Sequence, residues 1–354
     1  MRRLSSLPLV AVLLAAFSAS AASETRGTWT ASPARRDAQQ LQLQLHHSNE
    51  RGNMGFSEPL SAFKGLSTGD GATSFTLPRE AGTFSFEGQF KGGEGAGHYR
   101  FTPSETYAKA MAGLGYPNLS ADDHYKLAAT DVTTARIKDL AAVGYKNLSM
   151  DELMQVGIFD VTPAYVSELA KAGYEKLTME QLVAGRIHGV TAQRVQGLAG
   201  AGFPKLPWDD VLAMNIHGVT PEYIREVRAL GFKDLDKDEI VAFRIHGVTP
   251  AFVKELRDGG FKDVDADGFV GFRIHGVTPT FVKEMREQGF PDITDDQLVA
   301  FRIHGVTTDF VKRMRAAGYT RITPDELVSL RIHGVDETFI RAMSGGDGGA
   351  PRKK

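Results

Sequence analysis

The sequence has no cysteine, almost no net charge and only one long apolar run, which lies near its N-terminus. The absence of cysteine excludes disulfide bonds, thiol catalysis, cysteine-bound zinc and a lipid anchor on cysteine. Because 41 Lys and Arg residues nearly balance 43 Asp and Glu residues, no basic field exists to attract nucleic acid or acidic lipids. Only two tryptophans are present, Trp29 and Trp208, and we expect both to be packing residues.

The N-terminal segment has the plan of a secretory signal peptide. A positive start at residues 1–3 precedes the apolar run Leu7–Phe17, and the small residues Ala19–Ala21 follow as a cleavage site. The run is shorter than the roughly 20 residues that a transmembrane helix needs. We therefore expect Sec-type export, cleavage after Ala21, and a periplasmic or secreted mature protein. The alternatives are an uncleaved anchor and a buried helix.

A repeat of 29 residues fills residues 104–343. The string Ile-His-Gly-Val recurs without insertion or deletion from Ile187 to Ile332, and weaker copies precede it. Each unit begins with a residue type that caps helix N-termini. These start residues are Ser104, Thr133, Thr162, Thr191, Thr220, Thr249, Thr278, Thr307 and Asp336. Apolar residues three, four and seven positions after each start predict an amphipathic helix.

Glycine ends the predicted helices. It stands eleven positions after the first eight start residues, where a left-handed residue closes a helix, at Gly115, Gly144, Gly173, Gly202, Gly231, Gly260, Gly289 and Gly318. A second capping pattern, such as Thr178 with Gln181, then starts a second helix. One such hairpin cannot bury its apolar stripe alone. We therefore expect an α-solenoid of eight helical hairpins and a final half repeat, followed by a flexible tail at 344–354.

Residues 27–103 predict a small β-rich domain, so the expected fold class is α+β. Apolar and polar residues alternate over Leu41–Leu45 and Phe84–Phe90, as in half-buried strands, and Tyr99 and Phe101 fit a return strand. We expect an antiparallel sheet of five or six strands, with a sandwich as one possible arrangement. The domain would serve either as a docking module or as the N-terminal cap of the solenoid.

Two glycine-containing segments mark turns in this domain. Arg79–Gly82 predicts a tight turn, and Gly92–Gly97 (GGEGAG) predicts a flexible hairpin loop. The second segment could also be a phosphate cradle. However, neither a helix start nor the Lys-Ser of a P-loop follows it, so we favour the loop.

One histidine recurs in each of the last six full units. The histidine ladder comprises His188, His217, His246, His275, His304 and His333. Metal ligands lie about 2 Å from one ion, whereas equivalent atoms of neighbouring units are about 9 Å apart. We therefore predict no metal site here. The remaining interpretations are a pH switch and closure of each helix at its negative dipole end.

An arginine ladder lies two residues before these histidines. It comprises Arg186, Arg244, Arg273, Arg302 and Arg331, with Asn215 in the gap. Evenly spaced guanidinium groups could bind carboxylates or phosphates. Together with the histidine ladder, they are our candidate binding residues. The alternative is internal ion pairing with first-helix acids such as Glu226, Glu255 and Glu284.

No catalytic centre is predicted. A catalytic triad needs one unique site, whereas the polar residues of a repeat are multiplied along the array. The pair His46-His47 lies outside the repeats, but neighbours on a strand point to opposite faces and chelate poorly. We therefore expect a non-enzymatic protein without a cofactor.

The repeat motif resembles a known type. The phrase Arg-Ile-His-Gly-Val-Thr-Pro-x-Phe-Val-x-Glu-[Leu/Met], at Arg244–Leu256 and Arg273–Met285, resembles helical repeats of exported bacterial proteins. These include the tails of some BlaR/MecR-type antirepressor membrane metallopeptidases. The run Arg79–Gly88 resembles a segment that precedes such repeats, so the resemblance covers about residues 28–343. The family's peptidase requires a transmembrane bundle and an HExxH motif, which this sequence lacks, so no catalytic residue is carried over.

These observations favour an extracytoplasmic scaffold. The resemblance implies a sensing or scaffolding part without the peptidase. We expect the solenoid surface to bind a protein or peptide partner, with envelope signalling as the more specific version. The alternative is an anionic glycan or cell-wall polymer bound along the arginine ladder. We expect no nucleic-acid partner and no membrane span after processing.

Overall fold

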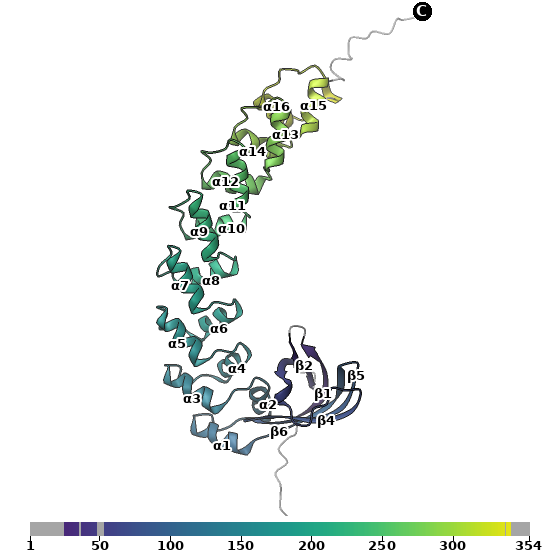
Figure 1. Ribbon diagram of the computed structural model, residues 1–354, viewed down its shortest axis with the longest axis vertical. Coiled ribbons are helices and arrows are strands. Elements are labelled where there is room, and N and C mark those ends of the chain that lie inside the picture. The colour runs from purple at the N-terminus through teal and green to yellow at the C-terminus, as the bar shows by residue number, and fades with distance from the viewer. Residues whose placement is uncertain (1–24, 35–36, 48–52, 337, 341–354) are drawn as a thin grey trace, which may run out of the picture. The chain divides into compact units, whose positions relative to one another are not determined.

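Figure 1 shows a computed structural model of the chain, which describes residues 25–34, 37–47, 53–336 and 338–340. The predicted signal peptide and the whole of the predicted tail lie outside these residues. The chain divides into two compact units between Ser167 and Glu168, and each unit is described by itself. Within the described ranges, no helix is both long and apolar enough to span a bilayer.

The N-terminal unit begins with one antiparallel sheet of six strands. Their bounds are β1 (Thr25–Ala34), β2 (Asp37–His47), β3 (Asn53–Pro59), β4 (Gly71–Arg79), β5 (Gly82–Lys91) and β6 (Glu94–Pro103), with the 3₁₀ turn η1 (Leu60–Ala62) after β3. Their order in the sheet is β3-β2-β1-β6-β5-β4. The described strands form a single sheet rather than two packed sheets, so the sandwich arrangement was wrong and the strand count was right.

One face of this sheet carries an aromatic core. Trp29 is completely buried, and its ring packs edge-on against Phe75 and Phe86 at centroid distances of 5.3 and 5.9 Å. The neighbouring strand β6 leaves space for the Trp29 ring because it has glycine at position 95, where a Cβ atom would lie 2.7 Å from the ring. The predicted return strand is confirmed, because Phe86 faces Tyr99 across the β5–β6 pair.

Both predicted turns join neighbouring strands. Arg79 pairs with Gly82, so the tight β4–β5 turn is confirmed. The β5–β6 connection is shorter than we expected, because Lys91 already pairs with Glu94. Only Gly92 and Gly93 form the turn, with φ of 59° and 84°. Two consecutive positive φ values characterise a type I′ hairpin, which explains the glycine pair.

In the described part of the chain, sixteen helices are assigned after the sheet, two in each full repeat. The N-terminal unit contains α1 (Glu105–Gly113), α2 (Ala121–Ala129), α3 (Thr134–Ala142) and α4 (Met150–Ile158), and α5 (Pro163–Lys171) spans the division between the units. The C-terminal unit contains α6 (Met179–Ile187), α7 (Ala192–Gly200), α8 (Trp208–Ile216), α9 (Pro221–Ala229), α10 (Lys237–Ile245), α11 (Pro250–Asp258), α12 (Ala266–His275), α13 (Pro279–Glu287), α14 (Asp295–His304), α15 (Thr308–Ala316) and α16 (Pro324–Ile332). The predicted helical repeats are therefore confirmed.

The predicted helix boundaries follow from local side-chain chemistry. All nine start residues accept a hydrogen bond from a backbone amide three residues later, from Ser104 (3.2 Å) to Asp336 (2.9 Å). The closing glycines have positive φ, as at Gly260 (100°). Asp131 and Asp160 take the same left-handed conformation in the first two units, with φ of 52° and 51°.

Within each unit, equivalent helices of successive repeats lie against one another. The second helices form one such row, since α8, α10, α12, α14 and α16 each contact the next (Figure 1). First helices make the same kind of contact, as between α11 and α13. Buried aromatic side chains such as Phe272 and Phe301 fill the space between the helices. The repeats thus share one continuous apolar core within the C-terminal unit.

The sheet and the first two repeats are joined inside the N-terminal unit. Helix α2 packs against β1, β5 and β6. The β4–β5 turn adds polar contacts: the Glu80 carboxylate accepts hydrogen bonds from the Thr134 amide (2.9 Å) and hydroxyl (2.5 Å), and the Ala81 carbonyl lies 3.0 Å from His124 Nδ1. The β4–β5 turn belongs to the run Arg79–Gly88, which resembles a segment that precedes similar helical repeats in other proteins. In this structure the turn connects the sheet directly to the helices.

Candidate functional site

The arginine ladder lies at the C-terminal ends of second helices and contacts the preceding repeat. In four of its members the guanidinium carbon lies 4.8–4.9 Å from the centroid of an aromatic ring. The pairs are Arg244 with Tyr223, Arg273 with Phe252, Arg302 with Phe281 and Arg331 with Phe310. Arg186 occupies the equivalent place in α6 and is half-buried.

The same arginines satisfy the ends of neighbouring helices. Nε of Arg273 donates to the backbone carbonyl of His246 at 3.2 Å, and Arg302 and Arg331 repeat this contact one and two units later. Asn215, in the gap of the ladder, donates its amide to the His188 carbonyl. In the described part of the chain, rings and carbonyl oxygens are therefore the recurring partners of the ladder. The alternative partners, first-helix acids such as Glu255, form no ion pair with Arg244, Arg273, Arg302 or Arg331 among the described residues.

A second set of arginines, which we had not predicted, lies on the first helices. Its members stand eight residues after the helix start and pack over the aromatic residue that follows the closing glycine of the preceding repeat. The pairs are Arg228 with Phe203, Arg257 with Phe232, Arg286 with Phe261 and Arg315 with Phe290, at 4.7–5.2 Å. Arg257 and Arg286 also donate to carbonyls of that repeat. The constant spacing of these arginines from the start residue of their helix is the sequence signal that could have identified them.

Replacing Arg273 with methionine is expected to lower the free energy of unfolding by about 1–2 kcal/mol. The change removes one cation–π contact and one hydrogen bond but keeps the apolar stem. Urea denaturation measures the loss. The control is Lys254→Met, an equivalent change at an exposed position of α11, which should stay within about 0.5 kcal/mol of the unchanged protein. Equal stability of the two variants would refute a structural role for the ladder.

The histidine ladder ends the second helices. His188, His217, His246 and His333 are their C-terminal caps, while His275 and His304 are the last helical residues. His304 is half-buried and the other five are exposed. His333 also places Nδ1 2.8 Å from the carbonyl of Ser329. Across the described ranges, no three His, Asp or Glu side chains gather closely enough to hold a metal ion.

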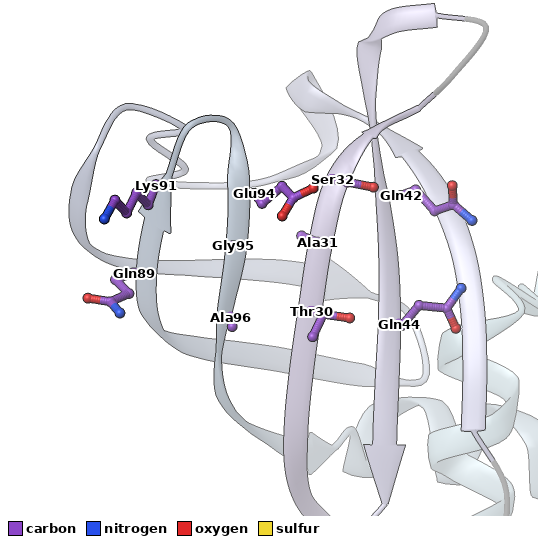
Figure 2. Close-up of a pocket in the computed structure, with 10 residues that line it drawn as sticks. All are labelled: Thr30, Ala31, Ser32, Gln42, Gln44, Gln89, Lys91, Glu94, Gly95 and Ala96. Carbon is purple, nitrogen blue, oxygen red and sulfur yellow. The ribbon is translucent and has the colours of Figure 1, made fainter.

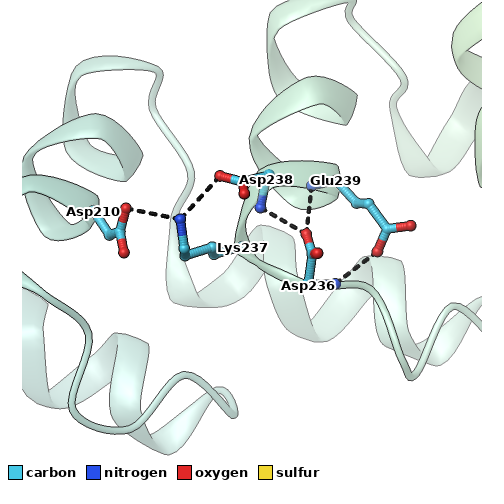
Figure 3. A network of polar contacts seen from close by, with 5 residues as sticks. All are labelled: Asp210, Asp236, Lys237, Asp238 and Glu239. Carbon is cyan, nitrogen blue, oxygen red and sulfur yellow. Dashed lines mark hydrogen bonds and ion pairs between the residues drawn. The ribbon is translucent and has the colours of Figure 1, made fainter.

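Ion pairs add to the contacts between neighbouring repeats. Lys237, at the start of α10, lies 3.0 Å from the carboxylate of Asp210 on α8 and 3.1 Å from Asp238 (Figure 3). These hydrogen bonds raise the pKa of Lys237. Asp236 and Glu239 form the adjacent capping box.

Trp208 starts α8 in the same region and is buried against Tyr174, so its predicted packing role is confirmed.

An unexpected feature is a row of exposed isoleucines at the ends of the second helices. We call it the isoleucine stripe. Its members in the C-terminal unit are Ile187, Ile216, Ile245, Ile274, Ile303 and Ile332, each 53–57% exposed. One turn earlier lie small or half-buried apolar residues, such as Val241 and Ala242 before Ile245. Residues three and four positions apart share a helix face, so each second helix presents a small apolar patch to solvent.

In the N-terminal unit, helix α4 has the equivalent isoleucine, Ile158, although the residues beside it differ from those of the later repeats. Helix α4 ends in Gly157-Ile158-Phe159-Asp160, at the place of Arg-Ile-His-Gly in later units. Ile158 is 58% exposed, so it contributes little to the core. The recurrence of an exposed isoleucine without its usual neighbours indicates a role outside the internal contacts of the array.

The first repeat shows how this face is covered by another part of the chain. Tyr125 and Ala129 of α2 occupy the positions of Val270 and Ile274, five repeats away. Tyr125 packs against the sheet aromatics Phe84 and Phe101, and Ala129 is only 4% exposed. Thus the face that carries the isoleucine stripe elsewhere is covered in this repeat by the sheet of the same unit.

A scan against protein-family models and a search of the curated proteins both found no match.

Proposed function

We propose that the chain is a non-enzymatic, extracytoplasmic scaffold that binds a protein partner along the solvent-exposed face of its second helices. The observation that carries this proposal is the exposed isoleucine that recurs in seven repeats. Contiguous apolar surface that a protein keeps exposed commonly marks an interaction site. The predicted signal peptide supports the location, and envelope signalling is the more specific role.

The chemistry around the stripe defines the partner. Each of Ile245, Ile274 and Ile303 stands between an exposed arginine of the ladder and a histidine. A partner segment that carries apolar side chains and nearby carboxylates complements this arrangement. The aromatic stacking of the guanidinium groups fixes them in place, so little side-chain entropy is lost on binding.

The alternative, an anionic polymer bound along the arginine ladder, has less support. The four stacked guanidinium groups already contact rings, and three of them use Nε on helix carbonyls. A purely anionic polymer also leaves the exposed isoleucines unexplained.

Replacing Ile245, Ile274 and Ile303 together with serine is expected to reduce partner capture at least tenfold. Burial of an isoleucine that is half-exposed in the free protein contributes about 1 kcal/mol, so three such changes allow a tenfold to roughly hundredfold loss. Capture is measured by proximity cross-linking in the intact cell envelope. The stability of the variant should change little, because all three side chains are exposed.

The matched control replaces Lys254, Lys283 and Lys312, which are exposed on first helices of three repeats, with serine. It should capture the same discrete protein as the unchanged chain. A protein captured equally by the isoleucine variant would place the contact elsewhere. Cross-links to envelope polymer alone, or to no discrete protein, would overturn the scaffold proposal.

A further inference from the structure

The junction in front of helix α7 differs from the later junctions of the array. In four later repeats, the residue eight positions after the helix start is an arginine that packs over an aromatic ring of the preceding repeat. Alanine holds this position in the first four repeats, up to Ala199 of α7, and arginine holds it from Arg228 of α9 onward. By the 29-residue period, the ring that corresponds to Ala199 is Tyr174.

A hollow of about 400 Å³ lies at this junction, inside the C-terminal unit. Its lining includes Ala172, Tyr174, Ala199 and Val211, and we call it the Tyr174 hollow. Its volume is in the range typical of small-molecule sites. The smaller side chain at position 199 thus coincides with open space beside the ring.

Arg257 indicates which group fits such a space. Its guanidinium carbon lies 4.7 Å from the ring centroid of Phe232 and 5.7 Å from that of Phe269, and its Nη1 donates to the Leu230 carbonyl. Two periods of 29 residues earlier, these three neighbours correspond to Tyr174, Val211 and Ala172. All three line the hollow. The ring and the carbonyl that hold a guanidinium group in a later repeat therefore both border the Tyr174 hollow.

The acceptor in this arrangement has no other partner. The Ala172 carbonyl follows the last turn of α5, where backbone carbonyls have no intrahelical donor, and among the described residues it accepts no hydrogen bond. The equivalent carbonyls of Leu230 and Gly259 each accept one from an arginine.

The ring of Tyr174 is held in place from other directions. Its hydroxyl donates to the Leu206 carbonyl at 2.6 Å, and Trp208, which does not line the hollow, packs against it at a centroid distance of 5.3 Å. Phe232 likewise packs edge-on against Phe243 while Arg257 lies over its face. Aromatic packing of this ring is therefore compatible with a cation over it.

Lys205 adds a feature that the later junctions lack. It lines the hollow and is exposed, whereas the three following repeats have aspartate at this position, at Asp234, Asp263 and Asp292. An ammonium group beside a guanidinium site favours a ligand that also carries a carboxylate. Free arginine and arginine at the C-terminus of a peptide have both groups.

The sheet carries a larger hollow, of about 680 Å³, which Figure 2 shows. Amides and hydroxyls line it, and Thr30, Gln42 and Gln89 are exposed. Such a lining is typical of the solvated face of an antiparallel sheet. In the described part of the chain, no second copy of this surface indicates an occupant. The Tyr174 hollow differs because the repeats supply that comparison.

We propose that the Tyr174 hollow binds arginine, either free or at the C-terminus of a peptide. The guanidinium group lies over Tyr174 and donates to the Ala172 carbonyl, as Arg257 does two repeats later. The alkyl stem lies beside Ala199, and the carboxylate pairs with Lys205. A cation over an aromatic ring is held more strongly where water is partly excluded. The site does not depend on the proposed use of the isoleucine stripe.

The test is titration calorimetry of the full chain with arginine. Citrulline keeps the carboxylate but has a neutral group in place of guanidinium, and agmatine keeps the guanidinium group but has no carboxylate. Both should bind at least tenfold more weakly than arginine. The dipeptide glycyl-arginine distinguishes the two sources: tighter binding than arginine indicates a peptide C-terminus, and weaker binding indicates the free amino acid.

Three variants test the assigned contacts. Ala199→Arg supplies the guanidinium group from the chain itself, so arginine binding should be lost while the melting midpoint stays the same or rises. Tyr174→Phe keeps the ring and should retain binding, whereas Tyr174→Leu should weaken it at least tenfold. Lys205 has a φ of 56°, which asparagine tolerates, so Lys205→Asn tests its charge without backbone strain. This variant should bind arginine no more tightly than agmatine.

The matched control is Ala251→Arg, the same substitution at an exposed position of α11. It should bind arginine as the unchanged chain does. Equal loss in this control would show an unspecific effect of charge, and equal binding of citrulline would show that the guanidinium group is not recognised. Either result, arginine binding retained by Ala199→Arg, or no binding by the unchanged chain would overturn the proposal. Melting midpoints verify that the variants fold.

Discussion

Replacing Tyr125 with alanine is expected to lower the free energy of unfolding of the N-terminal unit by about 3–5 kcal/mol. Tyr125 is 4% exposed, and its ring centroid lies 5.7, 5.8 and 6.2 Å from those of Phe84, Phe101 and Tyr99. Its hydroxyl also accepts a hydrogen bond from Tyr99 at 3.1 Å. The change leaves a cavity where α2 meets the sheet. Urea denaturation followed by near-ultraviolet circular dichroism measures the effect.

The 29-residue repeat supplies a matched control for this variant. Val270 occupies the position of Tyr125 five repeats later and is half-buried. Because no sheet covers it, Val270→Ala should cost less than about 1 kcal/mol. A loss below about 1 kcal/mol for Tyr125→Ala would mean that the sheet does not depend on α2 for its stability.

Raising the pH from 11 to 12 is expected to cost the N-terminal unit roughly 2.5 kcal/mol through two tyrosines. Burial raises the pKa of Tyr107 and of Tyr125, and the hydrogen bond with Tyr99 contributes at Tyr125. Above pH 10 the unfolded chain releases both protons, whereas the folded unit retains them. The unfolded state then binds fewer protons, so stability falls with pH by about 1.4 kcal/mol per unit for each tyrosine.

The variant Tyr125→Phe isolates one of these contributions. It keeps the ring and removes the ionisable hydroxyl, so its unfolding free energy should fall less steeply above pH 10, by about 1.4 kcal/mol per pH unit. Below pH 9 its stability should not depend on pH differently from that of the unchanged protein. Identical slopes above pH 10 would show that the Tyr125 hydroxyl ionises freely in the folded state.

The helix boundaries could be predicted because their signals are local. A threonine such as Thr278 bonds an amide only three residues away, at Phe281, and Gly289 closes the same helix by its own backbone conformation. Strand alternation is equally local, so the strand at Phe84–Phe90 and the return strand at Tyr99 and Phe101 could be predicted, whereas their register could not. Whether strands form one sheet or two depends on long-range packing, which alternation does not specify.

The candidate sites were harder to predict because their partners come from other repeats or strands. Arg273 contacts Phe252 only because two repeats lie side by side. From the sequence alone, a nearby acidic residue such as Glu255 was an equally reasonable partner for this arginine. Ile274 belongs to the recurring Ile-His-Gly-Val string, but recurrence alone does not show that this side chain lies at a helix end and faces solvent. The Tyr174 hollow required the contacts that Arg257 makes across a junction, which no local pattern gives.

The two sets of stacked arginines have a consequence for how such a chain can change length. Each guanidinium group reaches back by one repeat, so every junction carries its own complete set of contacts. Gain or loss of a whole 29-residue period leaves each remaining arginine with an equivalent ring, and no junction needs redesign. Unequal crossing-over in the gene can therefore add or remove one 29-residue repeat at a time, and each such step changes the number of exposed isoleucines by one.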